Sequence, residues 1–97
     1  MGGLCYYLIM KKIKKKIHPE YFDNVLSGKK KFDLRLNEFE VEEGDVLVLQ
    51  EWDPESGEYT GREMEKKVVQ VSRFKLADLH WPREEVEEKG LQIMSLE

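Results

Sequence analysis

Two β-rich runs joined by a turn-forming stretch constrain the fold of this chain more than any other feature. Residues 45–52, DVLVLQEW, are rich in side chains that favour strands, and residues 62–74, REMEKKVVQVSRF, alternate between two faces. The segment between them, DPESGEYTG at 53–61, has the Pro, Ser and Gly residues typical of a hairpin loop. The sequence therefore predicts a β-hairpin in the middle of the chain.

Three further segments have the patterns of short strands. They are MKKIKKKI at 10–17, KKFDLRL at 30–36 and LQIMSL at 91–96. Short antiparallel strands expose unpaired edges, which a closed barrel removes. The predicted fold is therefore α+β but mainly β: a small barrel of about five or six strands with two short helices.

Two segments carry helix signals. In HPEYFDNVLSGK, Pro19 suits a first helical position and Gly28 suits the position just past the end, which predicts a helix from about Pro19 to Ser27. After a short helical turn, Pro82 is expected to open a second helix that ends at Gly90. The apolar residues of the first helix recur at helical spacing and predict one buried stripe: Tyr21, Phe22, Val25 and Leu26.

Length and composition narrow the class of protein. A chain of 97 residues fits a single domain, residues 1–97, and a charged content of 37%, mostly Lys and Glu, is also seen in heat-adapted proteins. Cys5 is the one cysteine, which excludes an internal disulfide and a cysteine-based zinc site. This usage favours a reducing cytoplasm as the location.

The first nine residues allow two interpretations. Leu4 to Met10 is an apolar run, but it is too short to cross a bilayer, so we expect no membrane association. Lysines follow this run, whereas a signal peptide would place positive charge before it. Residues 1–9 are then either an upstream extension, with Met10 as the natural start, or the beginning of an early first strand.

Positive charge is concentrated in the first third of the chain. Residues 11–35 contain nine Lys or Arg and three Asp or Glu, whereas residues 36–97 contain seven and seventeen. The net charge of −4 therefore combines a basic first third with an acidic remainder. We expect the basic part to form a pole that attracts phosphate groups.

The segment SGKKKFDLRL at 27–36 combines this charge with alternation. In a strand, Lys31, Asp33 and Arg35 would point to one side, and Lys30 would fall on the other side with Phe32, Leu34 and Leu36. A bulge near residues 28–30, or a position of Lys30 at the mouth of the strand, would let its ammonium enter a cleft beside Asp33 and Arg35, and we favour the second arrangement. The alternative is a solvated face of ion pairs, which contributes only about 0–1 kcal/mol per pair.

Two motifs in this chain resemble a known family. GKKKFDLR at 28–35 is similar to the signature Gly-x-Lys-x-x-Glu-x-Arg of the ASCH superfamily, with Gly28, Lys30 and Arg35 matching and Asp33 in place of the Glu. VEEGDVLVLQEWDPESGEYTGR at 41–62 resembles the second block of a subgroup of short, uncharacterised prokaryotic and phage proteins. The resemblance covers about residues 13–74. It implies a small PUA-like β-barrel with a polar cleft flanked by the first helix.

The resemblance also implies a module that binds RNA or a nucleotide. We expect no cofactor and a monomeric chain. Trp52 would stack on a base, or plug the end of the barrel. Tyr59 and Arg62 would complete a clamp, or belong to an ordinary hairpin. The expected binding residues are Lys29, Lys30, Lys31, Asp33, Arg35, Trp52, Tyr59 and Arg62.

An enzyme is the main alternative. A bacterial branch of the superfamily hydrolyses N4-acetylcytidine with a Lys, a Thr and a Glu, so a nucleoside amidohydrolase would use Lys30, Asp33 and Glu51. In that branch the Thr replaces the Glu of the signature, and Asp33 stands at this place here. A third alternative is a protein-interaction adaptor that uses the acidic two-thirds of the chain. His18 and His80 lack the spacing of metal ligands, so no metal is expected.

Overall fold

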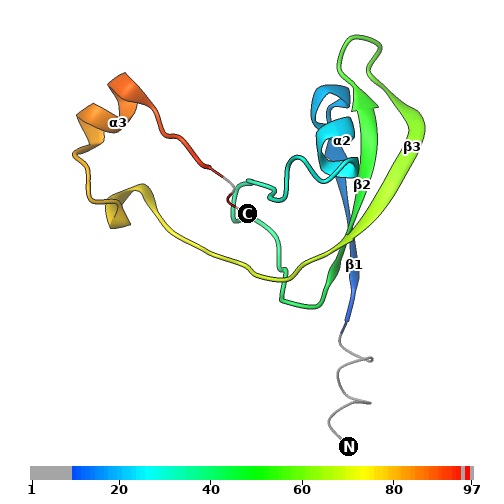
Figure 1. Ribbon diagram of the computed structural model, residues 1–97, viewed down its shortest axis with the longest axis horizontal. Coiled ribbons are helices and arrows are strands. Elements are labelled where there is room, and N and C mark those ends of the chain that lie inside the picture. The colour runs from blue at the N-terminus through cyan, green and yellow to red at the C-terminus, as the bar shows by residue number, and fades with distance from the viewer. Residues whose placement is uncertain (1–9, 95, 97) are drawn as a thin grey trace, which may run out of the picture.

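A computed structural model of the chain describes residues 10–94 and 96 (Figure 1). The prediction about residues 1–9 therefore lies outside the described part. The elements in order are β1 (Lys12–Ile17), α2 (Pro19–Leu26), β2 (Val46–Asp53), β3 (Glu58–Lys67), the 3₁₀ turn η1 (Leu76–Asp78) and α3 (Arg83–Lys89). The three strands form one sheet in the order β1-β2-β3, with β1 parallel and β3 antiparallel to β2.

The predicted barrel of five or six strands is wrong, because the described residues form an open sheet of three strands. Residues 30–36 follow α2 as an irregular connection, in which Leu34 and Leu36 are 66% and 75% exposed. Residues 91–94 and 96 likewise form no strand, and β3 ends at Lys67 rather than at residue 74. Alternation gives a segment two faces, but a strand also needs a neighbour that pairs with its backbone.

The local signals for the remaining elements are confirmed. The hairpin of β2 and β3 turns over residues 54–57, and α2 ends at Leu26 with Ser27 as its C-cap. Gly28 adopts φ +82°, the left-handed conformation that glycine tolerates best just past a helix end. Pro82 and Gly90 flank α3 as its caps. Short-range chemistry therefore determined the limits of the two helices and the existence of the hairpin. The expected loop over residues 53–61 is too long, because β3 begins at Glu58 and not at residue 62.

The core lies on one face of the sheet, which α2 covers in part (Figure 1). It consists of buried apolar side chains from all three strands and from the helix: Ile17, Phe22, Val25, Leu49 and Met64. Tyr21 and Leu26 are 44% and 52% exposed, so only half of the predicted helical stripe is buried. Leu47 packs against the core cluster from a partly buried position further along β2.

A buried carboxylate fixes the start of β2. Asp45 is 3% exposed, and its two carboxylate oxygens accept hydrogen bonds from the backbone N–H groups of Lys11 (3.2 Å) and Glu42 (2.9 Å). The ammonium of Lys11 lies 4.0 Å from the same carboxylate. These bonds satisfy a charge that would be costly to bury alone, and they join β1 to the loop before β2.

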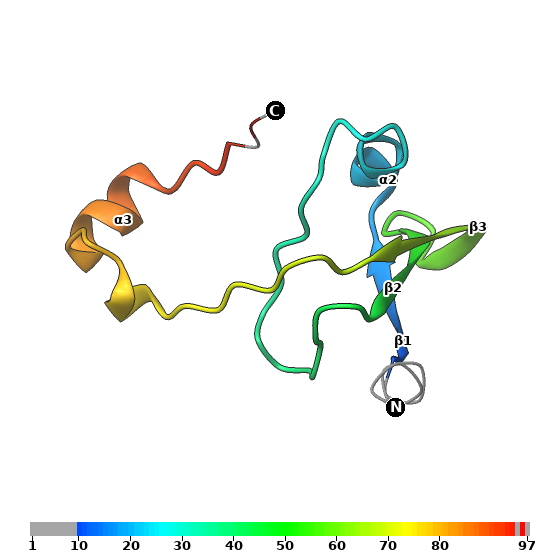
Figure 2. The ribbon, with the colours of Figure 1, turned by 60° about the horizontal axis from the view of Figure 1, so that its bottom comes forward.

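Beyond β3 the chain extends away from the sheet. Both Figure 1 and Figure 2 show η1 and α3 apart from the three strands, and neither element contains a buried residue. We call residues 75–94 and 96 the arm. Its large apolar side chains are exposed: Leu76, Trp81, Leu91, Ile93, Met94 and Leu96.

The small core makes the fold sensitive to single truncations. Leu49 is 2% exposed at the centre of the sheet, so Leu49→Ala should lower the free energy of unfolding by about 2–5 kcal/mol. The matched change Leu36→Ala, at a side chain that is 75% exposed, should alter it by less than about 0.5 kcal/mol. Urea unfolding followed by circular dichroism measures both values. Equal losses would contradict this location of the core.

Candidate functional site

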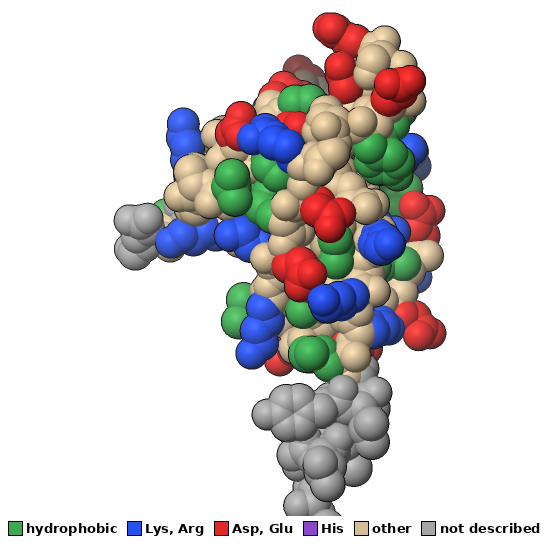
Figure 3. Space-filling model, turned by 90° about the vertical axis from the view of Figure 1, so that its right-hand side faces the viewer, with side chains coloured by type: hydrophobic (Ala, Val, Ile, Leu, Met, Phe, Trp, Pro, Cys, Tyr) green, Lys and Arg blue, Asp and Glu red, His purple; other side chains and the backbone are tan. Residues whose placement is uncertain are grey.

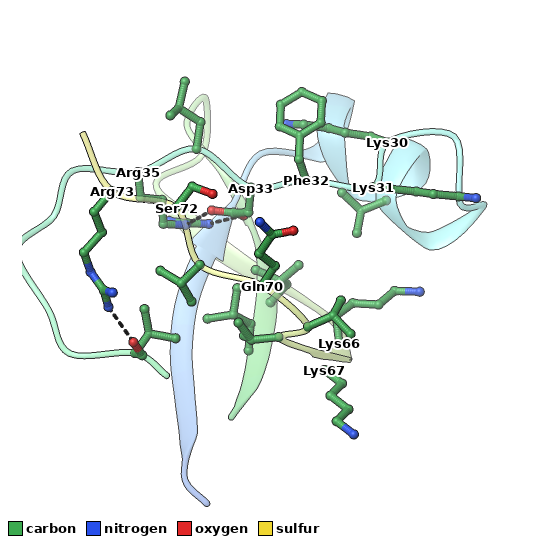
Figure 4. A pocket seen from close by; sticks show the side chains of 18 of the residues that line it. Lys30, Lys31, Phe32, Asp33, Arg35, Lys66, Lys67, Gln70, Ser72 and Arg73 are labelled. Carbon is green, nitrogen blue, oxygen red and sulfur yellow. Dashed lines mark hydrogen bonds and ion pairs between the residues drawn. The ribbon is translucent and has the colours of Figure 1, made fainter. Parts of the chain in front are cut away.

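A groove of about 700 Å³ lies over the core side of the sheet, beside α2 (Figure 4). Leu47 and Leu49 of β2 belong to its lining. Its walls come from two segments far apart in the sequence, residues 30–41 and residues 66–74. The groove exists because α2 covers only part of this face, and the two irregular segments border the rest.

Cations dominate the charged residues that line the groove. A single carboxylate, Asp33, accompanies six Lys or Arg residues: Lys30, Lys31, Arg35, Lys66, Lys67 and Arg73. The chain as a whole carries a net charge of −4, so the excess of positive charge is a local property of the groove. A concave surface lined by one sign of charge raises the local concentration of the opposite ion. The groove is therefore suited to an anionic ligand.

Arg35 is held in place at the groove wall. Its guanidinium donates through Nε and Nη2 to the two carboxylate oxygens of Asp33, and Nη2 also donates to the backbone oxygen of Lys16 at 2.8 Å. Figure 4 shows Asp33 and Arg35 side by side, joined by these bonds. The prediction that the two side chains share a side is confirmed, although the segment is not a strand. Bidentate pairing fixes the plane of a guanidinium.

Lys30 lies among aromatic rings at the same groove. Its ammonium is 4.3 Å from the ring centroid of Tyr21 and 5.1 Å from that of Phe32, both cation–π distances. Lys31 also lines the groove, whereas Lys29 is exposed nearby and does not line it. Phe39 and Phe74 add two further rings to the lining. The site therefore offers both positive charge and aromatic surface.

The predicted aromatic residues of the hairpin lie elsewhere. Trp52 and Tyr59 are cross-strand partners in β2 and β3, and neither lines the groove. The ammonium of Lys16 lies 4.5 Å from the Trp52 ring and 5.7 Å from the Tyr59 ring. Lys16 precedes the buried Ile17 in β1, so these side chains are on the sheet face opposite the core. Figure 3 shows Lys, Arg, Asp and Glu side chains interspersed on one side of the molecule.

The buried Glu51 and the exposed Arg62 form a separate network at a bulge in the hairpin. The register passes from the Gln50–Glu63 pair to the Trp52–Tyr59 pair, so Glu51 alone faces three residues of β3. Gly61, in the middle of these three, has φ +96°, which a side chain would strain. Bulges of this kind bend a strand and redirect its side chains.

The carboxylate of Glu51 is fully engaged in that network. It is 4% exposed and accepts hydrogen bonds from Arg62 Nε at 3.0 Å, Arg62 Nη2 at 2.7 Å and the Thr60 hydroxyl at 2.6 Å. Arg62 Nη2 also donates to Asp23 of α2 at 3.1 Å. The guanidinium carbon of Arg62 lies 4.4 Å from the ring centroid of Phe22. The network therefore joins the hairpin to the helix.

The network sets the charge state of its members. Hydrogen bonds from Arg62 and then Thr60 lower the pKa of Glu51 from 4.5 to about 2, against the opposing effect of burial. The hydrogen bond to Glu51 raises the pKa of Arg62 above its usual range. Glu51 is therefore ionised at neutral pH, and it lies outside the lining of the groove that contains Lys30 and Asp33.

The structure thus divides the predicted site residues among three places. Lys30, Lys31, Asp33 and Arg35 share the groove, whereas Trp52 with Tyr59, and Glu51 with Arg62, lie apart from it. Sequence reasoning missed the contribution of residues 66–74, including Lys66, Lys67 and Arg73. A signal was present, because Lys66 is two residues from Met64 and shares its face of β3.

Comparison with known proteins places the chain in a family. The model of a domain of unknown function, DUF3850, matches residues 13–80, which include β1 except Lys12, all of α2, the hairpin and both walls of the groove. The chain belongs to the DUF3850 family. A protein of Escherichia phage P2, described as "Uncharacterized 12.9 kDa protein in GpA 3'region", is 42% identical over 57 residues, 59% of this chain. The DUF3850 chain spans 50% of the length of that phage protein.

Two further features of this DUF3850 chain concern metals and membranes. Among residues 10–94 and 96, no group of three or more His, Cys, Asp or Glu side chains is arranged to hold a metal ion. Within the same described residues, no helix has the length and apolar character needed to cross a membrane.

The network around Glu51 predicts a pH-dependent stability. Because the pKa of Glu51 is lowered to about 2, its charge stabilises the fold fully above pH 4.5, and this contribution is lost as the pH falls toward 2. Glu51→Gln should therefore lower the Tm at neutral pH, and the difference from the unmodified chain should shrink below pH 4.5.

Glu63→Gln is the matched control for this measurement. Glu63 accepts one exposed hydrogen bond from the Gln50 amide at 3.1 Å, so its replacement should change the Tm little at any pH. Thermal unfolding by circular dichroism across this pH range measures both variants. A Tm loss for Glu51→Gln that stays constant down to pH 2 would refute the role of its charge.

Proposed function

We propose that this chain is a binding module for RNA or a nucleotide, and that the ligand occupies the groove between residues 30–41 and 66–74. The observation that carries the proposal is the excess of six cations over one carboxylate in the groove of a chain with a net charge of −4. Phosphate groups dominate the affinity of proteins for nucleic acids through contacts with Lys and Arg.

Arg35 is the residue best placed to recognise the ligand. Asp33 and the Lys16 carbonyl hold its guanidinium at the groove wall, so little conformational freedom is lost when it binds. Nε and Nη2 are engaged in these bonds, so Nη1 is the guanidinium nitrogen that can donate to a phosphate or to the edge of a base. Lys31, Lys66 and Lys67 also line the groove, and in Figure 4 their side chains point outward on the side away from Arg35, where they can contact further phosphates.

Aromatic rings in the groove lining supply surfaces on which bases can stack. Phe32, Phe39 and Phe74 all line the groove, and single-stranded nucleic acids are bound by stacking bases on such rings. The volume of about 700 Å³ lies within the range of pockets that hold nucleotide-sized ligands. Charge and aromatic surface together favour an unpaired nucleotide over a simple inorganic anion.

The arrangement does not favour the amidohydrolase alternative. Glu51 is hydrogen-bonded to Arg62 and Thr60, and it does not line the groove that Lys30 and Asp33 share. The ammonium of Lys30 is positioned over the rings of Tyr21 and Phe32. We therefore assign these groups to ligand binding and fold stability. A cytoplasmic location, expected from the cysteine usage, belongs to the same proposal.

The proposal predicts that the groove cations determine RNA affinity. Replacing Lys30 and Arg35 together by Ala should weaken binding of a short single-stranded oligoribonucleotide about tenfold or more. Loss of two phosphate contacts should also reduce the slope of log affinity against log salt by about 1.4, because each contact on a single strand contributes about 0.7. Fluorescence anisotropy with a labelled oligonucleotide, repeated over a salt series, measures both quantities.

Lys12 and Lys14 provide a matched control on the opposite side of the sheet. They alternate with Ile13 and point away from the core face, so their double replacement by Ala removes the same charge from a different place. This control should bind nearly as well as the unmodified chain. An equal loss in both double variants would show that overall charge, and not the groove, attracts the ligand. Unchanged affinity for the Lys30 and Arg35 variant would exclude the site.

A further inference from the structure

The exposed apolar surface of the described residues is concentrated in two places. Eleven of the fifteen large apolar side chains that are exposed belong either to the groove lining or to the arm. In the groove, Leu34, Leu36 and Val69 are 66%, 75% and 81% exposed. In the arm, Trp81, Met94 and Leu96 are 55%, 72% and 90% exposed. Large exposed apolar patches mark surfaces that become covered by a partner.

The charges of the two surfaces are complementary as well. Within α3, Arg83 pairs with Glu87 at 2.9 Å and Lys89 pairs with Glu85 at 3.6 Å. Glu84 and Glu88 are four residues apart on one side of the helix and have no ion pair among the described residues. Lys66 and Lys67 at the groove likewise have no carboxylate partner in the described part of the chain. An acidic helix face and a lysine pair thus remain available to each other.

The last residues of the arm alternate as the residues of a strand do, but those that the structure describes are not paired with another strand. Leu91, Ile93 and residue 95 alternate with Gln92, Met94 and Leu96. Residues 91–94 are exposed and form no strand in the structure. Such a segment can bury one row of apolar side chains when it docks in an apolar groove.

We propose that the arm of one chain docks in the groove of a second copy, and that two copies exchange arms reciprocally to form a dimer. In Figures 1 and 2, η1 and α3 lie apart from their own sheet, and the segment after α3 turns back toward it. Among the described residues, Glu84 and Glu88 of α3 therefore do not pair with the groove lysines of their own chain. Apolar side chains around Ile93 cover the walls formed by Leu34 and Leu36, while Glu84 and Glu88 approach the lysine pair. Two-fold symmetry makes both grooves equivalent, so the exchange closes at two copies.

This inference goes beyond the proposed binding of RNA and does not depend on it. The two are connected, because the arm brings carboxylates to lysines that an anionic ligand would also use. The test uses the full chain without nucleic acid, so its result is separate from that of the binding experiment.

Light scattering after size exclusion, over a dilution series, provides the first test. The unmodified chain should have twice the mass of 11.5 kDa at high concentration and dissociate on dilution. Ile93→Asp should raise the dimer dissociation constant at least about tenfold, because it places a charge in the apolar contact. Ser56→Asp adds the same charge in the exposed hairpin turn, outside both the groove lining and the arm, and should leave the constant nearly unchanged. A chain that stays at 11.5 kDa at every concentration would overturn the proposal and confirm the monomer expected from the sequence.

Mixing two defective variants distinguishes reciprocal exchange from other dimers. Leu36→Asp damages the groove and leaves the arm intact, whereas Ile93→Asp damages the arm and leaves the groove intact. Each variant alone should associate weakly, but an equimolar mixture should regain association through one intact arm and one intact groove. Circular dichroism verifies that both variants remain folded. If the mixture associates no better than its components, the arm does not dock in the groove of a second copy.

Discussion

The ion pair between Glu51 and Arg62 is the interaction on which the rest of the fold depends. It occurs at the bulge of the hairpin, and Arg62 extends from there to Asp23 and over the ring of Phe22. A buried carboxylate without partners would be strongly unfavourable, so this geometry specifies one register of β2 and β3 and one position of α2. The core and one end of the groove follow from that position.

The groove exists because α2 covers only part of the core face of the sheet. A helix of eight residues, α2, is too short to cover the face of a sheet whose longest strand has ten. The remaining surface is bordered by connections whose side chains are cationic, aromatic or apolar. Arg35 couples this border to the sheet, because it bonds to the Lys16 carbonyl of the edge strand β1. The same open surface supports both the proposed ligand and the proposed docking of a second copy.

Prediction from the sequence succeeded where the determining contacts are close in the chain. Pro19 and Gly28 located α2, Pro82 and Gly90 located α3, and the spacing of Asp33 and Arg35 placed these two side chains together. It failed for residues 30–36 and for residues 91–94 and 96, where alternation alone suggested strands. It also combined Glu51, Trp52 and Lys30 into one site, although the two faces of the sheet and the bulge separate them. Alternation in the predicted strand at 45–52 already indicated that Glu51 and Trp52 point to opposite faces, but not which distant side chains each face meets.

The sequence by itself determined the helix limits, the hairpin, the basic first third and the pairing of Asp33 with Arg35. These depend on backbone preferences and on contacts between residues a few positions apart. Only the tertiary structure decided that the sheet stays open, that residues 66–74 form the second wall of the groove, and that Glu51 is bound by Arg62. The physical reason is that strand pairing and burial are made between distant segments, whose partners no local pattern identifies.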